Sequence, residues 1–134
     1  MKKTLALFII LIVLRPLYAQ VKIHTNQNMS GTWNVYTEKY TYGERKTAYI
    51  TFSIWDTYIS ADDKSRSVYR IINKAKDVYE DDYKIFGWDC YDERNVQCRW
   101  SIIKYYSQDI PDVVTIIYPK IAYMYFISEV EKEK

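Results

Sequence analysis

The amino-acid sequence predicts an all-β domain in which about eight short strands follow one another as an antiparallel meander. Tyrosine supplies 15 of the 134 residues, and this side chain favours the half-buried surface of a sheet. Several segments alternate between apolar and polar residues with the period of a strand. Ala and Leu become scarce after residue 19, which argues against a helical bundle. Such strands can close into a barrel that leaves no exposed edge, and a β-sandwich is the alternative arrangement.

Residues 1–19 have the pattern of a secretory signal peptide, which sets them apart from the rest of the chain. Lys2 and Lys3 precede an apolar run at 6–14, and Ala19 supplies a small residue for cleavage. Because the run is too short to span a bilayer, we expect an exported mature chain without a membrane span, in the periplasm or outside the cell. Its expected parts are an irregular lead-in at 20–30, one β-barrel domain at 31–128 and a charged tail at 129–134.

The balance of charges excludes several classes of protein. The chain carries 19 Lys and Arg against 17 Asp and Glu, and some of the basic residues lie in the predicted leader. A near-neutral mature chain is not expected to bind nucleic acid, because proteins that do so are strongly basic. A chain of this length is also too short for several domains and for most cofactor enzymes. We therefore expect neither a nucleic-acid partner nor a cofactor.

Turn residues divide the mature chain into its expected strands. The clearest strand is 47–54, where every second residue is apolar. Residues 73–82 are polar and predict a loop. Segments 113–118 and 121–127 are apolar or aromatic on both faces, so they must be covered on both sides, by the contents of a barrel or by a partner. The other expected strands are 34–39, 57–61, 67–72 and the two arms of a hairpin within 83–105.

The hairpin within 83–105 can be predicted in register. Centring it on Arg94 makes 93–95 its loop, in which Asn95 can adopt the left-handed conformation that a three-residue loop requires. Three pairs then lie on one face and a charged pair on the other: Trp88 with Trp100, Cys90 with Cys98, Phe86 with Ile102, and Asp89 with Arg99. In an oxidising compartment we expect Cys90 and Cys98 to form a structural disulfide across the hairpin.

The segment 29–35 resembles the opening of lipocalins and fatty-acid-binding proteins, the calycin group. Gly31-Thr32-Trp33 carries the G-x-W motif that begins their first strand. The resemblance implies an up-and-down barrel with a cup for a small apolar ligand, and it gives Trp33 the role of plugging the closed end. Lipocalins also carry a late arginine that packs on this tryptophan, whereas no arginine follows Arg99 here. The stretch after Ile110 leaves no room for their terminal helix.

Residues with catalytic or metal-binding potential are few. His24 is the only histidine and lies in the predicted lead-in, with no sequence motif that supplies a nucleophile or an orienting group. The acidic clusters Asp62-Asp63 and Glu80-Asp81-Asp82 lack the alternate spacing and glycine of a calcium loop, and aspartate is common in turns. We therefore expect no enzyme, no catalytic residue and no metal site.

Aromatic residues supply the remaining functional signal, because their faces stack on ligands and are frequent at interfaces. We expect a non-enzymatic module that holds a small apolar or amphipathic ligand in the barrel lumen. The alternative is a protein-interaction or inhibitor module of the cell envelope, which binds an unidentified protein and no small ligand. A lumen filled by side chains favours the alternative, whereas a cavity of several hundred cubic ångströms favours a ligand. The candidate binding residues are Trp33, Phe52, Trp88, Trp100 and Tyr118.

Overall fold

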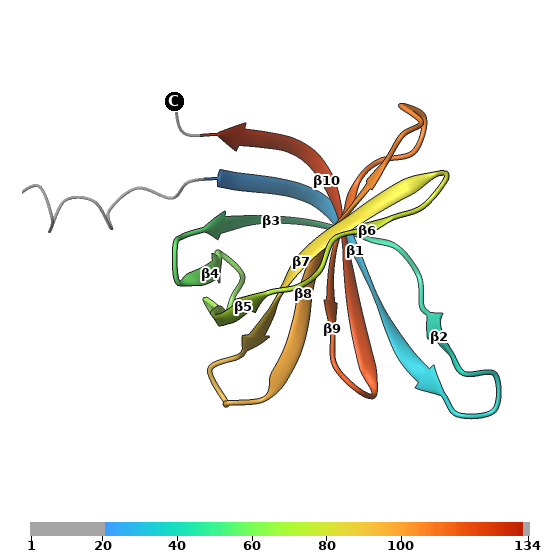
Figure 1. Ribbon diagram of the computed structural model, residues 1–134, viewed down its shortest axis with the longest axis horizontal. Coiled ribbons are helices and arrows are strands. Elements are labelled where there is room, and N and C mark those ends of the chain that lie inside the picture. Colours follow the sequence, from blue (N-terminus) through green and yellow to red (C-terminus); the bar gives the residue numbers. More distant parts are fainter. Residues whose placement is uncertain (1–20, 133–134) are drawn as a thin grey trace, which may run out of the picture.

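Ten strands and no helix make up residues 21–132, the part of the chain that the computed structural model describes (Figure 1). Accordingly, this part contains no apolar helix of membrane-spanning length. The predicted signal peptide at 1–19 lies outside the described residues. The strands are β1 Val21–Asn34, β2 Lys39–Tyr42, β3 Lys46–Ile54, β4 Tyr58–Ala61, β5 Val68–Lys74, β6 Val78–Tyr79, β7 Tyr83–Tyr91, β8 Gln97–Tyr105, β9 Val113–Ile117 and β10 Ile121–Lys132.

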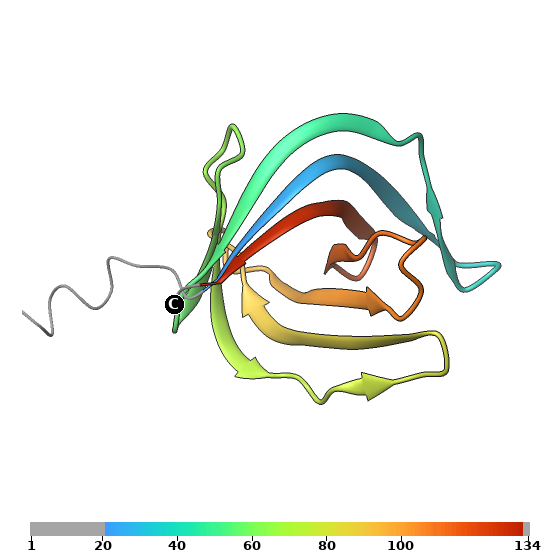
Figure 2. The same cartoon turned by 90° about the horizontal axis from the view of Figure 1, so that it is seen from above.

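The strands form a closed antiparallel barrel, because β10 returns to pair with β1. The order around the barrel is β1, β3, β4, β5, β7, β8, β9 and β10. The two extra strands are β2, which pairs with residues 31–34 of β1, and β6, which pairs with β7. Figure 2 shows β3, β1 and β10 arching over β7 and β8. The eight-stranded meander is thus confirmed, and its strands close into a barrel rather than a sandwich.

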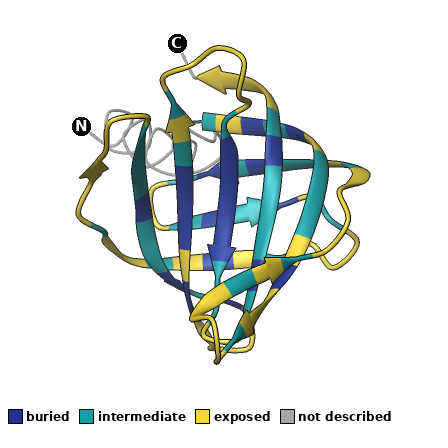
Figure 3. Ribbon diagram, turned by 90° about the vertical axis from the view of Figure 1, so that its right-hand side faces the viewer, coloured by how far each residue is buried: buried dark blue, intermediate teal, exposed yellow. Residues whose placement is uncertain are grey.

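The centre of the barrel is filled by side chains from alternate strand positions. Trp100, Phe52 and Ile59 are at most 1% exposed. The Phe52 ring packs edge to face on Trp100, with 5.6 Å between ring centres. In Figure 3 the buried residues lie along the middle of the strands, and the exposed ones lie in the connecting loops and towards the ends of strands. Removing these apolar groups from water is the main force that holds the barrel together.

The hairpin of β7 and β8 has the predicted register. The confirmed pairs are Trp88 with Trp100, Cys90 with Cys98, Phe86 with Ile102, and Asp89 with Arg99. Its loop is 93–95, since the Asp92 N–H donates to the Val96 carbonyl at 3.0 Å. Asn95 has φ 61°, a left-handed conformation that asparagine tolerates better than most residues. The hairpin can therefore turn tightly without a glycine.

The predicted disulfide between Cys90 and Cys98 is wrong, because both cysteines are free and buried. The two residues face each other two positions along the strands from Asp92 and Val96, whose backbones are joined by a hydrogen bond. Because hydrogen-bonded and non-hydrogen-bonded pairs alternate along antiparallel strands, Cys90 and Cys98 are also a hydrogen-bonded pair. In such a pair the Cβ atoms lie about 5.5 Å apart, whereas a disulfide needs about 3.8 Å. The register was therefore necessary for a disulfide but not sufficient.

Burial makes both thiols poor nucleophiles. It raises the pKa of Cys90 to about 12 and that of Cys98 to about 11. We expect neither thiol to react with iodoacetamide at about pH 8 in the folded protein, because the thiolate is the reactive form. In urea without a reductant, both should react, as counted by intact mass. A denatured, unreduced chain that takes up no label would instead establish a disulfide.

The two ends of the described chain are paired strands, which corrects the predicted lead-in and tail. Residues 21–30 belong to β1, where Ile23 and Thr25 are buried and Lys22 is exposed. Register shifts on either side of Thr25 interrupt the alternation and hide the strand from a search for a period of two. Residues 129–132 likewise continue β10 and pair with the first residues of β1. The barrel domain therefore begins before residue 31 and extends past residue 128.

The first predicted strand, 34–39, is also wrong. Residues 35–38 form the turn between β1 and β2, which together project from the barrel (Figure 1). The Asn34 side chain sets this turn, because its Oδ1 accepts the N–H groups of Tyr36 at 2.9 Å and Thr37 at 3.2 Å. The valine and tyrosine that suggested a strand therefore lie at an exposed tip.

We call residues 31–42 the aromatic arm. It is tied to the β9–β10 connection, because the Trp33 N–H donates to the Lys120 carbonyl at 2.9 Å and the Tyr40 hydroxyl to the Tyr118 carbonyl at 2.6 Å. Trp33 is 38% exposed and does not plug the barrel, which corrects the role implied by the resemblance to lipocalins. The reason is that β1 begins well before the motif, so the motif lies at the far end of the strand. The barrel architecture itself is compatible with a lipocalin-like fold.

Candidate functional site

A cavity of about 790 Å³ opens at one end of the barrel, where the β4–β5, β7–β8 and β9–β10 connections meet. We call it the tyrosine cup, because four tyrosines form its aromatic wall. These are Tyr69, Tyr118, Tyr123 and Tyr125. The other lining residues are Asp63, Ser65, Ser67, Asp92, Glu93, Arg94, Val96, Pro119, Lys120 and Ile121.

Strand geometry positions the tyrosine rings. Tyr123 and Tyr125 are two residues apart in β10, so both point to the same face of the sheet. The Tyr125 ring packs edge to face on the core residue Phe52, with 5.0 Å between centres. Burial raises the pKa of Tyr125 to about 12 and also raises that of Tyr69, so both phenols are neutral at physiological pH. The part of the cup wall that Tyr69 and Tyr125 form is therefore aromatic and uncharged.

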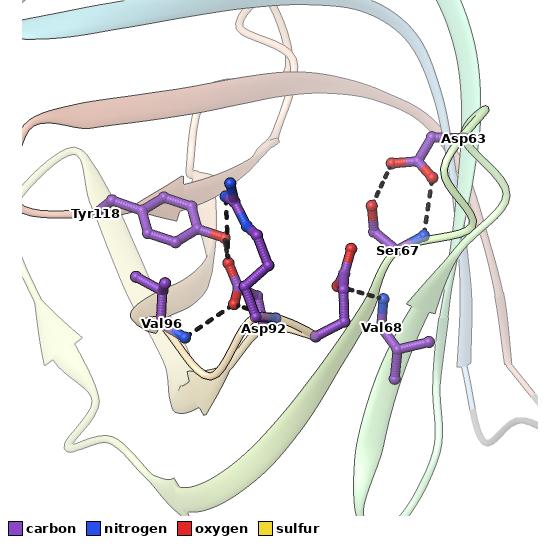
Figure 4. A network of polar contacts seen from close by, with 8 residues as sticks. Asp63, Ser67, Val68, Asp92, Val96 and Tyr118 are labelled. Atoms are coloured by element: carbon purple, nitrogen blue, oxygen red, sulfur yellow. Dashed lines mark hydrogen bonds and ion pairs between the residues drawn. The ribbon is translucent and has the colours of Figure 1, made fainter.

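Asp92 joins two sides of the cup (Figure 4). It is 6% exposed, and its carboxylate accepts the N–H groups of Arg94 and Val96 and the hydroxyl of Tyr118, each at 2.9 Å. Burial alone would raise the pKa of this carboxyl group. The three donors and the nearby Arg94 guanidinium outweigh burial, so the pKa lies below its usual range. Asp92 is thus a charged group that fixes the β7–β8 turn to Tyr118.

A second set of polar contacts holds the side of the cup formed by β4 and β5. Asp63 accepts the N–H of Ser67 at 2.9 Å and its hydroxyl at 2.7 Å (Figure 4). Glu93 accepts the N–H of Val68 at 3.2 Å, which connects the β7–β8 turn to β5. The rim is thus held by contacts within the protein. Because its loops are already ordered, binding of a ligand would cost little conformational entropy there.

The cup offers ring faces and hydroxyl groups to a ligand. Asp63 and Asp92 already accept hydrogen bonds from the protein, and the pKa of Tyr118 is raised by burial and by its hydrogen bond to Asp92. The Arg94 side chain is 79% exposed at the rim, and Lys120 is the other cationic lining residue. The arrangement can stack on rings and can bind polar groups through neutral phenols.

The structure separates the five binding residues that the sequence predicted. Tyr118 lines the cup. Phe52 and Trp100 belong to the packed core next to it, and Trp88 lies 5.7 Å from Trp100 between ring centres. Trp33 lies outside the barrel on the aromatic arm. Only one of the five is therefore a wall residue, and three others contribute to the filling of the lumen.

Sequence reasoning missed Tyr123, Tyr125 and Asp92. The two tyrosines had a usable signal, because their spacing of two places them on one face of a strand. Both faces of that strand are apolar, however, so alternation could not tell which face is inside. Asp92 also had a signal, since an aspartate just before a predicted turn commonly accepts hydrogen bonds from the turn N–H groups.

No protein-family model, no curated protein and no solved structure matches the chain. The likeness to lipocalins that the structure supports is that of the eight-stranded barrel. The case for a function rests on the geometry of the cup.

Proposed function

We propose that the protein is an exported, non-enzymatic binding barrel whose tyrosine cup holds a small amphipathic molecule. The observation that carries the proposal is a cavity of about 790 Å³ at the open end of a barrel whose centre is otherwise filled. Small-molecule sites commonly have volumes of about 300–1,000 Å³. Because the centre is filled, the proposed ligand occupies the mouth of the barrel and does not thread through the lumen.

The lining indicates the class of ligand. The rings of Tyr118 and Tyr123 meet edge to face with 6.3 Å between centres, so they present faces in two directions. A cyclic apolar body can stack on such faces, while the phenol hydroxyls bind its polar groups. The cationic lining residues Arg94 and Lys120 are exposed and lie at the rim, so the polar end of the ligand should face outward. An amphipathic molecule satisfies both parts of the cup.

Native mass spectrometry of the chain exported by its cells tests this proposal. The wild-type protein should carry a bound mass in a ratio of one to one, and denaturation should release it. Ser65→Trp should remove the bound mass, because Ser65 lines the cup and a larger side chain would occupy it. Ser107→Trp is the matched control, since Ser107 is exposed in the β8–β9 loop at the other end of the barrel. Its bound mass should be retained.

Two results would contradict a ligand in the cup, provided that far-UV circular dichroism shows all three proteins folded. One is a wild-type protein without any bound mass. The other is a Ser65→Trp protein that retains the bound mass at the wild-type level, which would place the molecule elsewhere.

The aromatic arm supports a second candidate function, the recognition of a protein partner. Val35 and Tyr36 at its tip are 69% and 94% exposed, and Trp33 behind them is 38% exposed. Apolar side chains on a projecting hairpin stabilise the barrel little and are typical of interface anchors. A wild-type chain without a small bound mass, but with a discrete protein complex that Tyr36→Ser abolishes, would assign the function to the arm.

A further inference from the structure

A second cluster of ligand-type side chains lies on the outer face of the barrel, where β1 pairs with β10. His24 lies opposite Glu129, and Glu131 is two residues further along β10 on the same face. One histidine nitrogen and one carboxylate oxygen from each glutamate all lie within 4.8 Å of one another. Closure of the barrel thus brings together three potential metal ligands from opposite ends of the chain.

The imidazole of His24 is oriented by β3. Its Nδ1 lies 2.8 Å from Oγ1 of Thr51, which is its cross-strand neighbour. Its Nε2 is shielded from solvent and has no hydrogen-bond partner among residues 21–132, although 32% of the side chain is exposed. When Nδ1 donates its proton to Thr51, Nε2 keeps a free lone pair, and the two glutamate carboxylates lie close to the ring. Metal-binding histidines are commonly oriented by a hydrogen bond of this kind on the other nitrogen.

Glu131 approaches this nitrogen closely, as an ion pair when the imidazole is protonated but not as a hydrogen bond. Its Oε1 lies 3.3 Å from Nε2 of His24, yet no atom of the described residues meets Nε2 with the directions of a hydrogen bond. Two ligands of one tetrahedral zinc ion lie about 3.4 Å apart, because each is about 2.1 Å from the metal. The contact therefore has the length of one edge of a zinc coordination site.

We propose that His24, Glu129 and Glu131 bind a divalent transition-metal ion of the zinc class, with water as the fourth ligand. An imidazole ligand favours such an ion over Mg²⁺ and Ca²⁺, which prefer oxygen ligands alone. Lys22 lies opposite Glu131, but no ion pair joins them within residues 21–132, so the carboxylate is available. The ion would join the first strand to the last beside the register shift at Thr25. The inference is independent of the tyrosine cup, because the two sites share no residue.

Titration of the full chain with Zn²⁺ tests the proposal, followed by long-range ¹H–¹⁵N NMR of the imidazole. The chain contains one histidine, so the spectrum reports His24 alone. We expect saturable binding of one ion, with a large change in the Nε2 resonance and a proton retained on Nδ1. Thr51→Val should weaken binding about 10-fold, because it removes the group that orients the ring. The wild-type Tm should rise with Zn²⁺, since the ion binds the folded chain.

Variants of the glutamates separate this site from adventitious binding. The double variant Glu129→Gln/Glu131→Gln keeps His24 and should lose saturable binding. Glu38→Gln/Glu44→Gln is the matched control, because it removes two exposed glutamates elsewhere on the surface, and it should bind as the wild type does. Absence of saturable binding in the wild type, a change at Nδ1 in place of Nε2, or unchanged binding by the first double variant would each overturn the proposal. Far-UV circular dichroism checks that every variant is folded.

Discussion

Replacement of Trp100 by alanine is expected to lower the free energy of unfolding by about 3–5 kcal/mol. Trp100 is fully buried and packs on Phe52 and Trp88, with ring centres 5.6 and 5.7 Å away. Alanine would leave a cavity at the centre of the closed sheet, whose neighbouring strands cannot collapse to fill it. Since domains are commonly stable by only about 5–15 kcal/mol, this is a large share of the total. Urea denaturation followed by far-UV circular dichroism measures it.

Two control variants show how much of this loss in the free energy of unfolding is due to the buried Trp100 ring. Trp100→Phe keeps an aromatic ring and removes an indole N–H that is buried without a partner in the described part of the chain. It should therefore lower the free energy of unfolding clearly less than Trp100→Ala does. Trp33→Ala removes the same side chain from the aromatic arm, where Trp33 is partly exposed, and should change stability by no more than about 1 kcal/mol. A Trp100→Ala protein as stable as Trp33→Ala would show that the barrel centre is not packed around this ring.

The parts of the fold that could be predicted from sequence are those in which independent local signals agree. The β7–β8 hairpin is the clearest case, because its aromatic pair, its charged pair and the left-handed Asn95 all fit one register. A shift by one residue would break all of these pairings together. The strand β3 was equally accessible, because its alternation is uninterrupted.

The parts that could not be predicted depend on contacts made only after the barrel closes. The first half of β1 lies beside β3 and β10, and its register shifts interrupt the alternation that a sequence search needs. The cup depends on the meeting of three connections, so Tyr118 was predicted without Tyr123 or Asp92. His24 and its two glutamates are neighbours only because the last strand returns to the first.

Replacement of Asp92 by alanine is expected to lower the free energy of unfolding by about 3 kcal/mol, because three donors lose a charged acceptor in a buried position. Tyr118→Phe removes one of these bonds and should cost about 1 kcal/mol. Once Asp92 is absent, the Tyr118 hydroxyl has lost this partner. Adding Tyr118→Phe to Asp92→Ala should therefore lower the free energy of unfolding only a little further. A double-mutant cycle in urea measures the coupling, expected at about 1 kcal/mol. Fully additive losses would contradict the hydrogen bond.

The same carboxyl group should make stability depend on pH. The pKa of Asp92 in the folded chain is lowered below the ordinary value of about 3.9, so folding favours the carboxylate. Its contribution is complete above that ordinary value and is lost as the pH falls through the lowered pKa. Asp92→Asn cannot ionise, so its stability should fall less between about pH 5 and about pH 2. Asp89, whose pKa is lowered by its hydrogen bonds to Arg99 and Asn73, supplies the same acid dependence in both proteins. Equal pH slopes in parallel urea titrations would show that Asp92 is not held as a carboxylate.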